Sequence, residues 1–176
     1  MRAPPTLFTP RLYLREWRLS DLDPIVAIKT DPKNWRFIGN GQPQSRERAV
    51  NVLGEFEREW LTNGVGRWAV EERATRELLG DCGIVLSERG PQLAYMIKRS
   101  RWGLGFATEA AHASLVYVFN TFEWPVVLAS VHPENVASRR VLEKLGMRHQ
   151  QTVEMVTGPE CWYAVKPQTL VTEVVP

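Results

Sequence analysis

Apolar and polar positions change their spacing along the chain, and the changes predict alternating strands and helices. Residues 11–17 have a two-residue period, which predicts a strand. Ser20 or Asp21 can cap a helix over residues 22–30. Ser45 can cap a longer helix to about residue 62, whose apolar side chains recur every three or four positions at Val50, Leu53, Phe56, Trp60 and Leu61. The segment between these helices, 31–44, has the prolines and glycines of a loop.

The second half of the chain predicts more strands and two more helices. Short strands are expected at residues 66–71, 78–85 and 93–97, and a continuous apolar run at 126–131 predicts a strand buried on both faces. Residues 107–119 and 136–145 have helical patterns, and 147–156 with 160–166 predict a final hairpin. We therefore expect one α+β (mixed α/β) domain over residues 1–176, with about seven strands and about four helices.

Composition restricts the classes of function. The charged fraction of 24% and the hydrophobic fraction of 44% are ordinary for a soluble globular protein. A net charge of +2 is too mild to indicate nucleic acid as a partner. No apolar run approaches the ~20 residues that span a bilayer, so we expect no membrane partner and a cytoplasmic location. Two cysteines and three scattered histidines lack the spacing of a metal site, so no metal is expected.

A glycine turn stands between the predicted strand at 93–97 and the helix that follows. Residues 99–110 read RSRWGLGFATEA. A strand, a glycine turn and a helix direct several free N–H groups and the positive end of the helix dipole at one point, which suits a phosphate or pyrophosphate. No nucleoside-triphosphate loop string occurs, and Thr108 stands where a dinucleotide fingerprint needs its third glycine. A coenzyme A loop and an ordinary strand-to-helix turn remain as interpretations.

This stretch resembles the GNAT superfamily of acyl-CoA N-acyltransferases, whose signature is Q/R-x-x-G-x-G/A. The last glycine of the signature falls on Gly105 and the small residue on Ala107, while Trp102 replaces the Gln or Arg. The form WGxGxATEA is similar to the RimJ/RimL branch of ribosomal-protein acetyltransferases. The order of the predicted elements is also the family's order over nearly the whole chain. The resemblance implies a mixed sheet whose fourth and fifth strands splay apart around the pantetheine arm.

A second stretch carries the same resemblance. Residues 132–138 read HPENVAS and are followed by VLEKLGM, which is similar to the family's N-x-x-S-x-x-x-x-E-K-x-G-F/M. Asn135 lies at the predicted start of a helix and Ser138 one turn later, so their side chains can point the same way. Alone, Asn135 is a helix cap and Ser138 an exposed serine. Two signatures in the right order on the right elements are more specific than either one.

The resemblance implies transfer of an acetyl group from acetyl-CoA to a primary amine, by direct attack in a ternary complex and without a metal. The backbone N–H near Met96 or Ile97 is the candidate oxyanion donor. Ser138 matches the family's position for an acid or a thiol hydrogen bond, and Arg139, Arg140 and Lys144 form a basic helix surface. The implied cofactor-binding residues are Met96, Ile97, Trp102, Gly103, Leu104, Gly105, Phe106, Ala107, Thr108, Asn135, Ser138 and Arg139.

The general base and the acceptor stay open. Gln92 stands where many relatives carry a glutamate, and Gln cannot accept a proton; the other candidates are Glu16, Glu71, Asp81 and His132. An α-amine, with a pKa of about 7.7–8.0, needs less help than a lysine at about 10.4. Three functions compete: acetylation of a protein N-terminus, with a ribosomal protein suggested by the branch; acetylation of a small amine such as an aminoglycoside, a polyamine or an amino acid; and CoA binding without catalysis. A homodimer through the C-terminal strands is a further expectation.

Overall fold

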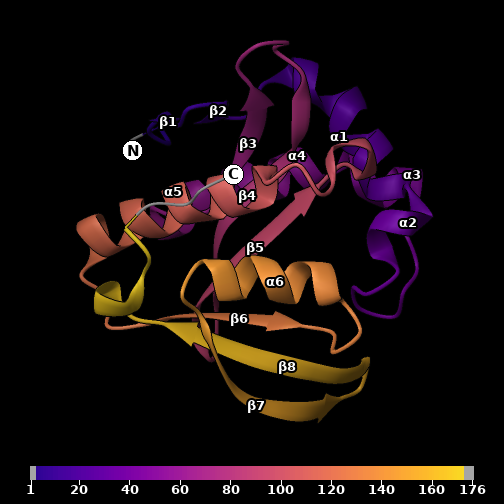
Figure 1. The fold of residues 1–176 in the computed structure, drawn as a ribbon. Helices are drawn as coiled ribbons and strands as arrows, with labels where there is room; N and C mark the ends of the chain where they lie inside the picture. Colours follow the sequence, from indigo (N-terminus) through magenta and orange to yellow (C-terminus); the bar gives the residue numbers. More distant parts are fainter. Residues whose placement is uncertain (1–2, 173–176) are drawn as a thin grey trace.

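The computed structural model describes residues 3–172, which build an eight-stranded mixed sheet in the order β1-β2-β3-β4-β5-β6-β8-β7 (Figure 1). Neighbouring strands are antiparallel except β5 and β6, which are parallel. The strands are β1 (Leu7–Phe8), β2 (Leu12–Arg15), β3 (Arg67–Glu72), β4 (Leu78–Ser87), β5 (Gly90–Ile97), β6 (Val127–Val131), β7 (Arg148–Met155) and β8 (Gly158–Val165).

Helices connect these strands and confirm the predicted mixed α/β class. They are α1 (Leu22–Thr30), α2 (Pro32–Trp35), α3 (Arg46–Val50), α4 (Val52–Asn63), α5 (Phe106–Phe122) and α6 (Val136–Lys144), with 3₁₀ turns η1 (Leu19–Asp21), η2 (Arg99–Arg101) and η3 (Pro167–Thr169). Compared with the sequence prediction, the described residues add the short β1 and α2 and divide the helix expected over 45–62. None of the helices in residues 3–172 has both the length and the apolar character that a bilayer crossing requires.

The division of the expected 45–62 helix has a local cause at Asn51. The Asn51 backbone N–H bonds to the Arg48 carbonyl three residues earlier, and its side chain donates to the Glu47 carbonyl. Such a side chain competes with the regular helical bonds and ends α3. Val50, expected on the apolar face, lies on the α3 side of this break and is 42% exposed. Leu61 was also expected on that face, but it follows the buried Trp60 on α4 and is 58% exposed.

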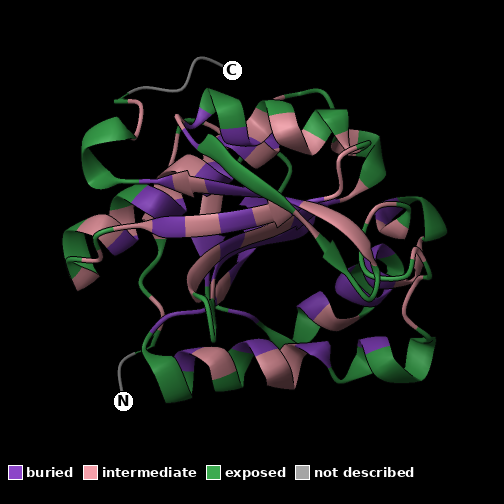
Figure 2. Cartoon of the chain, turned by 90° about the horizontal axis from the view of Figure 1, so that it is seen from below, coloured by how far each residue is buried: buried purple, intermediate pink, exposed green. Residues whose placement is uncertain are grey.

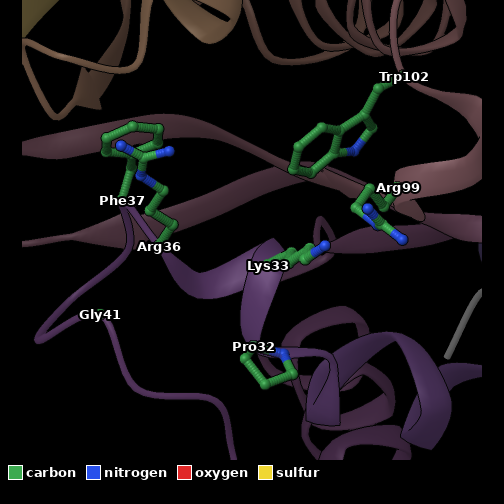
Figure 3. A pocket seen from close by; sticks show the side chains of 7 residues that line it. All are labelled: Pro32, Lys33, Arg36, Phe37, Gly41, Arg99 and Trp102. Carbon is green, nitrogen blue, oxygen red and sulfur yellow. The ribbon is translucent and has the colours of Figure 1, made fainter.

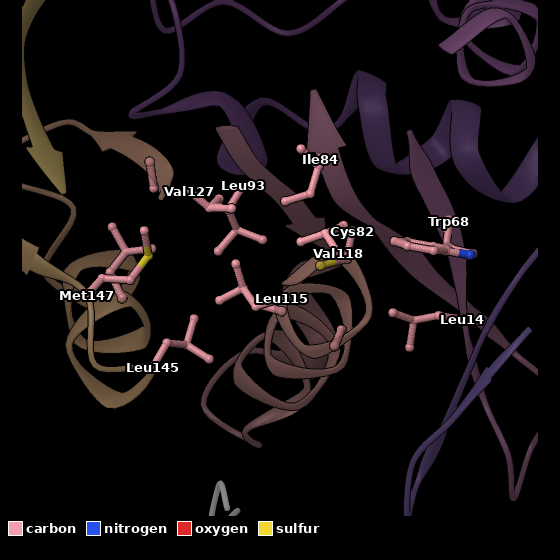
Figure 4. Close-up of a cluster of buried hydrophobic side chains, with 14 of the residues drawn as sticks. Leu14, Trp68, Cys82, Ile84, Leu93, Leu115, Val118, Val127, Leu145 and Met147 are labelled. Atoms are coloured by element: carbon pink, nitrogen blue, oxygen red, sulfur yellow. The ribbon is translucent and has the colours of Figure 1, made fainter. Parts of the chain in front are cut away.

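Two helical layers cover the two faces of the sheet. Side chains of α5 and α6 pack against one face, and Figure 4 shows Leu115 and Val118 of α5 inside this cluster. Side chains of α1 and α4 pack against the other face, around Phe56. Figure 2 shows the buried positions on the strands and on the helix sides turned toward them. Successive residues of β5 alternate between the clusters, so that Tyr95 joins the α5 side and Met96 the α1 side.

The sheet opens between β5 and β6. These two parallel strands pair only at Gln92 and Leu128, near the start of each strand, whereas β4 and β5 pair along the whole of β5. The C-terminal ends of β5 and β6 therefore separate. This confirms the splay expected between the fourth and fifth predicted strands, which are β5 and β6 here.

Candidate functional site

The glycine turn leaves several backbone N–H groups without partners. Gly103 and Gly105 have φ angles of +75° and +82°, a left-handed conformation that disfavours any side chain. Gly105 is the N-cap of α5, and no side chain caps that helix. Within residues 3–172, the N–H groups of Gly103, Leu104 and Gly105 donate to nothing. The first N–H groups of α5 follow at Phe106, Ala107 and Thr108, where a helix has no internal acceptors. The turn can therefore bind an anion.

The turn is held in place from both ends. The Trp102 indole Nε1 donates to the carbonyl of Ile97, the last residue of β5, at 2.6 Å. The Arg11 Nη1 donates to the Leu104 carbonyl at 2.8 Å, and the Arg11 Nε donates to Glu109 Oε2 at 2.7 Å. Glu109 is the acidic residue of the ATEA stretch. Its carboxylate links α5 to Arg11, just before β2, and Arg11 in turn holds the glycine turn through the Leu104 carbonyl.

Strand pairing decides which N–H groups face the gap between β5 and β6. The Lys98 N–H donates to the Leu79 carbonyl at 2.8 Å, so these two residues form a hydrogen-bonded pair. Such pairs alternate in an antiparallel ladder, which directs the N–H of Met96 toward β4. The N–H groups of Tyr95 and Ile97 point the other way, into the gap. Of the two positions expected to donate to an oxyanion, Ile97 has the suitable direction.

A hydroxyl pair lies between β5 and α6. The Tyr95 hydroxyl lies 2.7 Å from Ser138 Oγ and 3.3 Å from the Ser138 carbonyl, so its single proton has two acceptors within reach. Asn135 Oδ1 accepts from the Ser138 N–H at 3.1 Å, which is the helix cap expected from the sequence. Burial raises the pKa of Tyr95 further above neutral pH, where a phenol with the ordinary pKa of about 10 is already protonated. Sequence reasoning missed Tyr95 because it placed the residue within an apolar strand.

Arg139 does not extend freely from α6. Its Nε donates to the Tyr163 hydroxyl at 3.1 Å and its Nη1 to the Pro133 carbonyl at 3.3 Å. The hydrogen bond to Tyr163 also raises the pKa of the Arg139 guanidinium. The structure thus turns Arg139 toward β8, while Arg140 and Lys144 on the same helix are exposed.

Two carboxylates that the sequence offered as bases are buried in ion pairs. Glu71 Oε2 accepts from the Arg15 Nε at 2.5 Å, and Asp81 Oδ2 accepts from the Lys29 Nζ at 2.6 Å. Both carboxylates are almost fully buried, so these cations are needed to balance their charge. Glu16 is exposed just after β2. The two buried carboxylates are therefore parts of the core rather than free proton acceptors.

His132 and Gln92 are also engaged. The Nδ1 of His132 accepts from the Glu134 N–H at 3.2 Å, so the neutral ring carries its proton on Nε2 and has no free lone pair. The Gln92 Nε2 donates to Ser87 Oγ at 2.5 Å, in the hairpin between β4 and β5. Within residues 3–172 no three His, Cys, Asp or Glu side chains gather in a metal-binding arrangement.

Comparison with known proteins gives a consistent result. A family model described as Acetyltransferase (GNAT) domain matches residues 11–148. YkkB of Bacillus subtilis is 38% identical over 172 residues, which cover 94% of this chain and 98% of YkkB. An acetyltransferase from Agrobacterium tumefaciens is similar in structure with a TM-score of 0.81, at 24% identity and 94% and 96% coverage of the two chains. RimJ of Mycobacterium smegmatis, in complex with CoA-disulfide, has a TM-score of 0.77 at 20% identity, with 89% and 82% coverage. At these identities the two structural matches concern the fold alone.

Proposed function

The chain belongs to the GNAT family of acetyltransferases, and we propose that this acetyl-CoA-dependent enzyme acetylates an α-amine by direct attack within a ternary complex. In this proposal residues 1–176 act as one N-acetyltransferase domain. The observation that carries the proposal is the Tyr95–Ser138 hydroxyl pair, which lies where β5 and β6 separate.

The unpaired N–H groups support a path for acetyl-CoA. The CoA pyrophosphate binds at the glycine turn, between Gly103 and Thr108, where the α5 dipole adds to the attraction. The pantetheine arm then runs along the open edge of β5, beside Tyr95 and Ile97, and reaches Ser138 with its sulfur. The RimJ match, which contains CoA-disulfide, supports this use of the fold.

Direct attack requires addition of the amine to the thioester, departure of the thiolate and loss of a proton from the nitrogen. The amine nitrogen forms a bond to the carbonyl carbon, and the Ile97 N–H stabilises the negative charge that develops on the carbonyl oxygen. The C–S bond then breaks and the sulfur keeps the electron pair, while the proton lost by the nitrogen goes to water. Ser138 donates its hydroxyl hydrogen bond to the departing thiolate. Because a thiol has a pKa near ~8.5, this group leaves with only modest assistance.

An α-amine is the acceptor that best suits a site whose candidate bases already hold other partners. Glu71, Asp81 and His132 all hold other partners, and Gln92 cannot accept a proton. An amine with a pKa of about 7.7–8.0 is substantially deprotonated near neutral pH without a base, whereas a lysine at about 10.4 is not. A peptide N-terminus and a small α-amine both meet this requirement.

We would follow CoA thiol release from acetyl-CoA with peptides, amino acids, polyamines and aminoglycosides as acceptors. The assay reads CoA because both protein cysteines are buried, and burial raises the pKa of Cys82 to about 12. Ser138→Ala should lower kcat about tenfold, the effect of one hydrogen bond to a charged group. Ser20→Ala, an exposed serine in η1, is the matched control and should leave kcat unchanged.

The acceptor panel separates the competing functions. Turnover confined to peptides would indicate an N-terminal acetyltransferase, and turnover of small α-amines would indicate a metabolic enzyme. Faster acetylation of the lysine ε-amine than of the α-amine would contradict the proposed acceptor. Tight CoA binding without acetylation of any amine would contradict catalysis itself and leave a CoA-binding protein.

A further inference from the structure

A hollow of about 790 Å³ lies beside the end of β5 and is bounded by two separate segments of the chain (Figure 3). Phe37 and Arg36, at the end of α2, form one wall, and Trp102 and Arg99 form the other, with Lys33 between them. Cavities that bind small molecules commonly measure about 300–1,000 Å³. The hollow is therefore large enough for an acceptor.

Each wall of the hollow contacts the chain at the end of one of the two strands that splay apart. Trp102 is hydrogen-bonded to Ile97, the last residue of β5. On the opposite wall the Phe37 ring stacks on His132, which directly follows β6, with 5.6 Å between the ring centroids. Because β5 and β6 are parallel, both contacts lie at the same edge of the sheet. The hollow consequently lies at the wide end of the gap.

The α2 wall of the hollow belongs to the face of the sheet opposite Ser138. Trp35 of α2 packs with the α1 and α4 cluster, which also contains Met96. Tyr95, the partner of Ser138, packs with the α5 cluster on the other face. An acceptor in the hollow thus approaches the thioester from one face, while the thiolate departs toward Ser138 on the other.

The charge of the hollow is uncompensated. Three of its lining residues are the cations Lys33, Arg36 and Arg99, and none of the described lining residues is acidic. Among residues 3–172 no carboxylate lies within ion-pair distance of these three cations. The neighbours of Arg99 differ: Lys98 pairs with Glu77, and Arg101 pairs with Glu72 and Glu77. Lys33, Arg36 and Arg99 are exposed and, unlike these neighbours, have no carboxylate as an ion-pair partner among the described residues.

We propose that Lys33, Arg36 and Arg99 bind a carboxylate or phosphate group carried by the acceptor amine, while Phe37 and Trp102 contact its carbon skeleton. This inference rests on the acetyltransferase function proposed above and specifies the substrate class as an anionic amine. Guanidinium groups suit the planar geometry of carboxylates and phosphates. Polyamines and aminoglycosides are cationic, so the same charges repel them.

The phosphates of CoA are the other source of an anion at this site, and kinetics distinguish the two. We would compare acceptor pairs that differ only in charge, such as an amino acid and its amide, in wild type and in Lys33→Gln, Arg36→Gln and Arg99→Gln. Each substitution should raise KM for the anionic acceptor about tenfold, the value of one charged hydrogen bond. KM for acetyl-CoA and KM for the amide should not change. Arg58→Gln, an exposed arginine on α4 outside the hollow, is the matched control.

Three kinetic results would overturn the inference. Equal kcat/KM for the charged and the neutral acceptors would show that no anion is recognised. A rise in KM for acetyl-CoA instead of the acceptor would assign the cations to CoA. Efficient acetylation of polyamines would also contradict an anionic acceptor while leaving the acetyltransferase function intact.

A binding measurement tests the hollow even when no amine is acetylated, a result that would count against the proposed function. Inorganic phosphate would be titrated by calorimetry into the protein saturated with CoA. We expect binding to wild type and to Arg58→Gln, and its loss in the Lys33→Gln, Arg36→Gln double variant. Absence of binding to wild type, or equal binding to the double variant, would contradict an anion site.

Discussion

Tyr95 has a single hydroxyl proton, and its direction decides what Ser138 can do. Ser138 Oγ lies 2.7 Å away and the Ser138 carbonyl 3.3 Å away. When the phenol donates to the nearer oxygen, Ser138 keeps its own proton for another acceptor. The phenol is protonated at neutral pH and can donate, since its pKa lies above the ordinary value of about 10. Tyr95 is therefore a positioning residue, acting on the leaving thiolate only through Ser138.

The effects of removing the Tyr95 and Ser138 hydroxyls on kcat should consequently be coupled rather than additive. We expect Tyr95→Phe to lower kcat several-fold, up to about tenfold, with KM for acetyl-CoA unchanged, because one hydrogen bond to the developing thiolate is weakened. In the Ser138→Ala background, Tyr95→Phe should cause no further loss. Tyr13→Phe on β2, outside the site, is the matched control. Additive losses in the double variant would contradict action through Ser138.

Among single residues, the sequence identified those that lie in recognisable motifs. It missed those whose roles depend on contacts between distant segments of the chain. Asn135 and Ser138 were found because a spacing pattern names them. Tyr95 could not be found in this way, because its neighbours Leu93 and Ile97 indicate only a buried strand. The burial of Asp81 and Glu71 depends on Lys29 and Arg15, which are far away in sequence. Long-range charge pairing has no local pattern.

At the scale of elements, periodicity located the strands and helices but not their interruptions. The turn at Asn51 depends on one side-chain bond, and a helical pattern continues through it without a visible break. The splay between β5 and β6 likewise came from the family resemblance, because each strand alone looks fully buried. The glycine turn was the most predictable element, since Gly103 and Gly105 each adopt a conformation that other residues resist.

Gly103 and Gly64 offer a matched test of the turn. Their φ angles are +75° and +67°, and a Cβ added to either would meet nothing within 4 Å. Replacement of either glycine by Ala should therefore lower the free energy of unfolding by a similar amount, about 1 kcal/mol. Only Gly103→Ala should raise the Kd for CoA, because a methyl group there hinders approach of the pyrophosphate. Calorimetry with CoA and denaturant unfolding would measure both effects. Equal CoA affinities in the two variants would mean that the turn does not contact the anion.

At the scale of the whole molecule, the two helical layers divide the work of substrate binding. The α5 and α6 layer carries the glycine turn and Ser138, and the α1 to α4 layer carries α2, which forms one wall of the cationic hollow, while Arg99 and Trp102 before α5 form the other. The sheet holds the layers on either side of the gap between β5 and β6. At the far edge, β7 is exposed along almost its whole length, and the expected homodimer through these strands stays a prediction.

The α1 layer is attached to the sheet by a buried charge pair, whose contribution to stability can be measured. Lys29 of α1 and Asp81 of β4 are both almost fully buried, and their side chains meet at 2.6 Å. Lys29→Met would leave the Asp81 carboxylate in the core with only the distant Arg67, 3.9 Å away. Removing one partner of a buried pair costs about 3–5 kcal/mol, and we expect a loss toward the lower end because Arg67 remains.

Two further variants distinguish an unpaired charge from lost packing. Asp81→Asn added to Lys29→Met should recover part of the stability, since it removes the buried charge. Arg46→Met breaks a pair with Asp23 in which both side chains are mostly exposed, and it should cost under about 1 kcal/mol. Urea unfolding would compare the three. Because α1 leads directly into α2, Lys29→Met should also raise KM for the acceptor more than KM for acetyl-CoA. A greater effect on acetyl-CoA would contradict the assignment of the acceptor to the α1 to α4 layer.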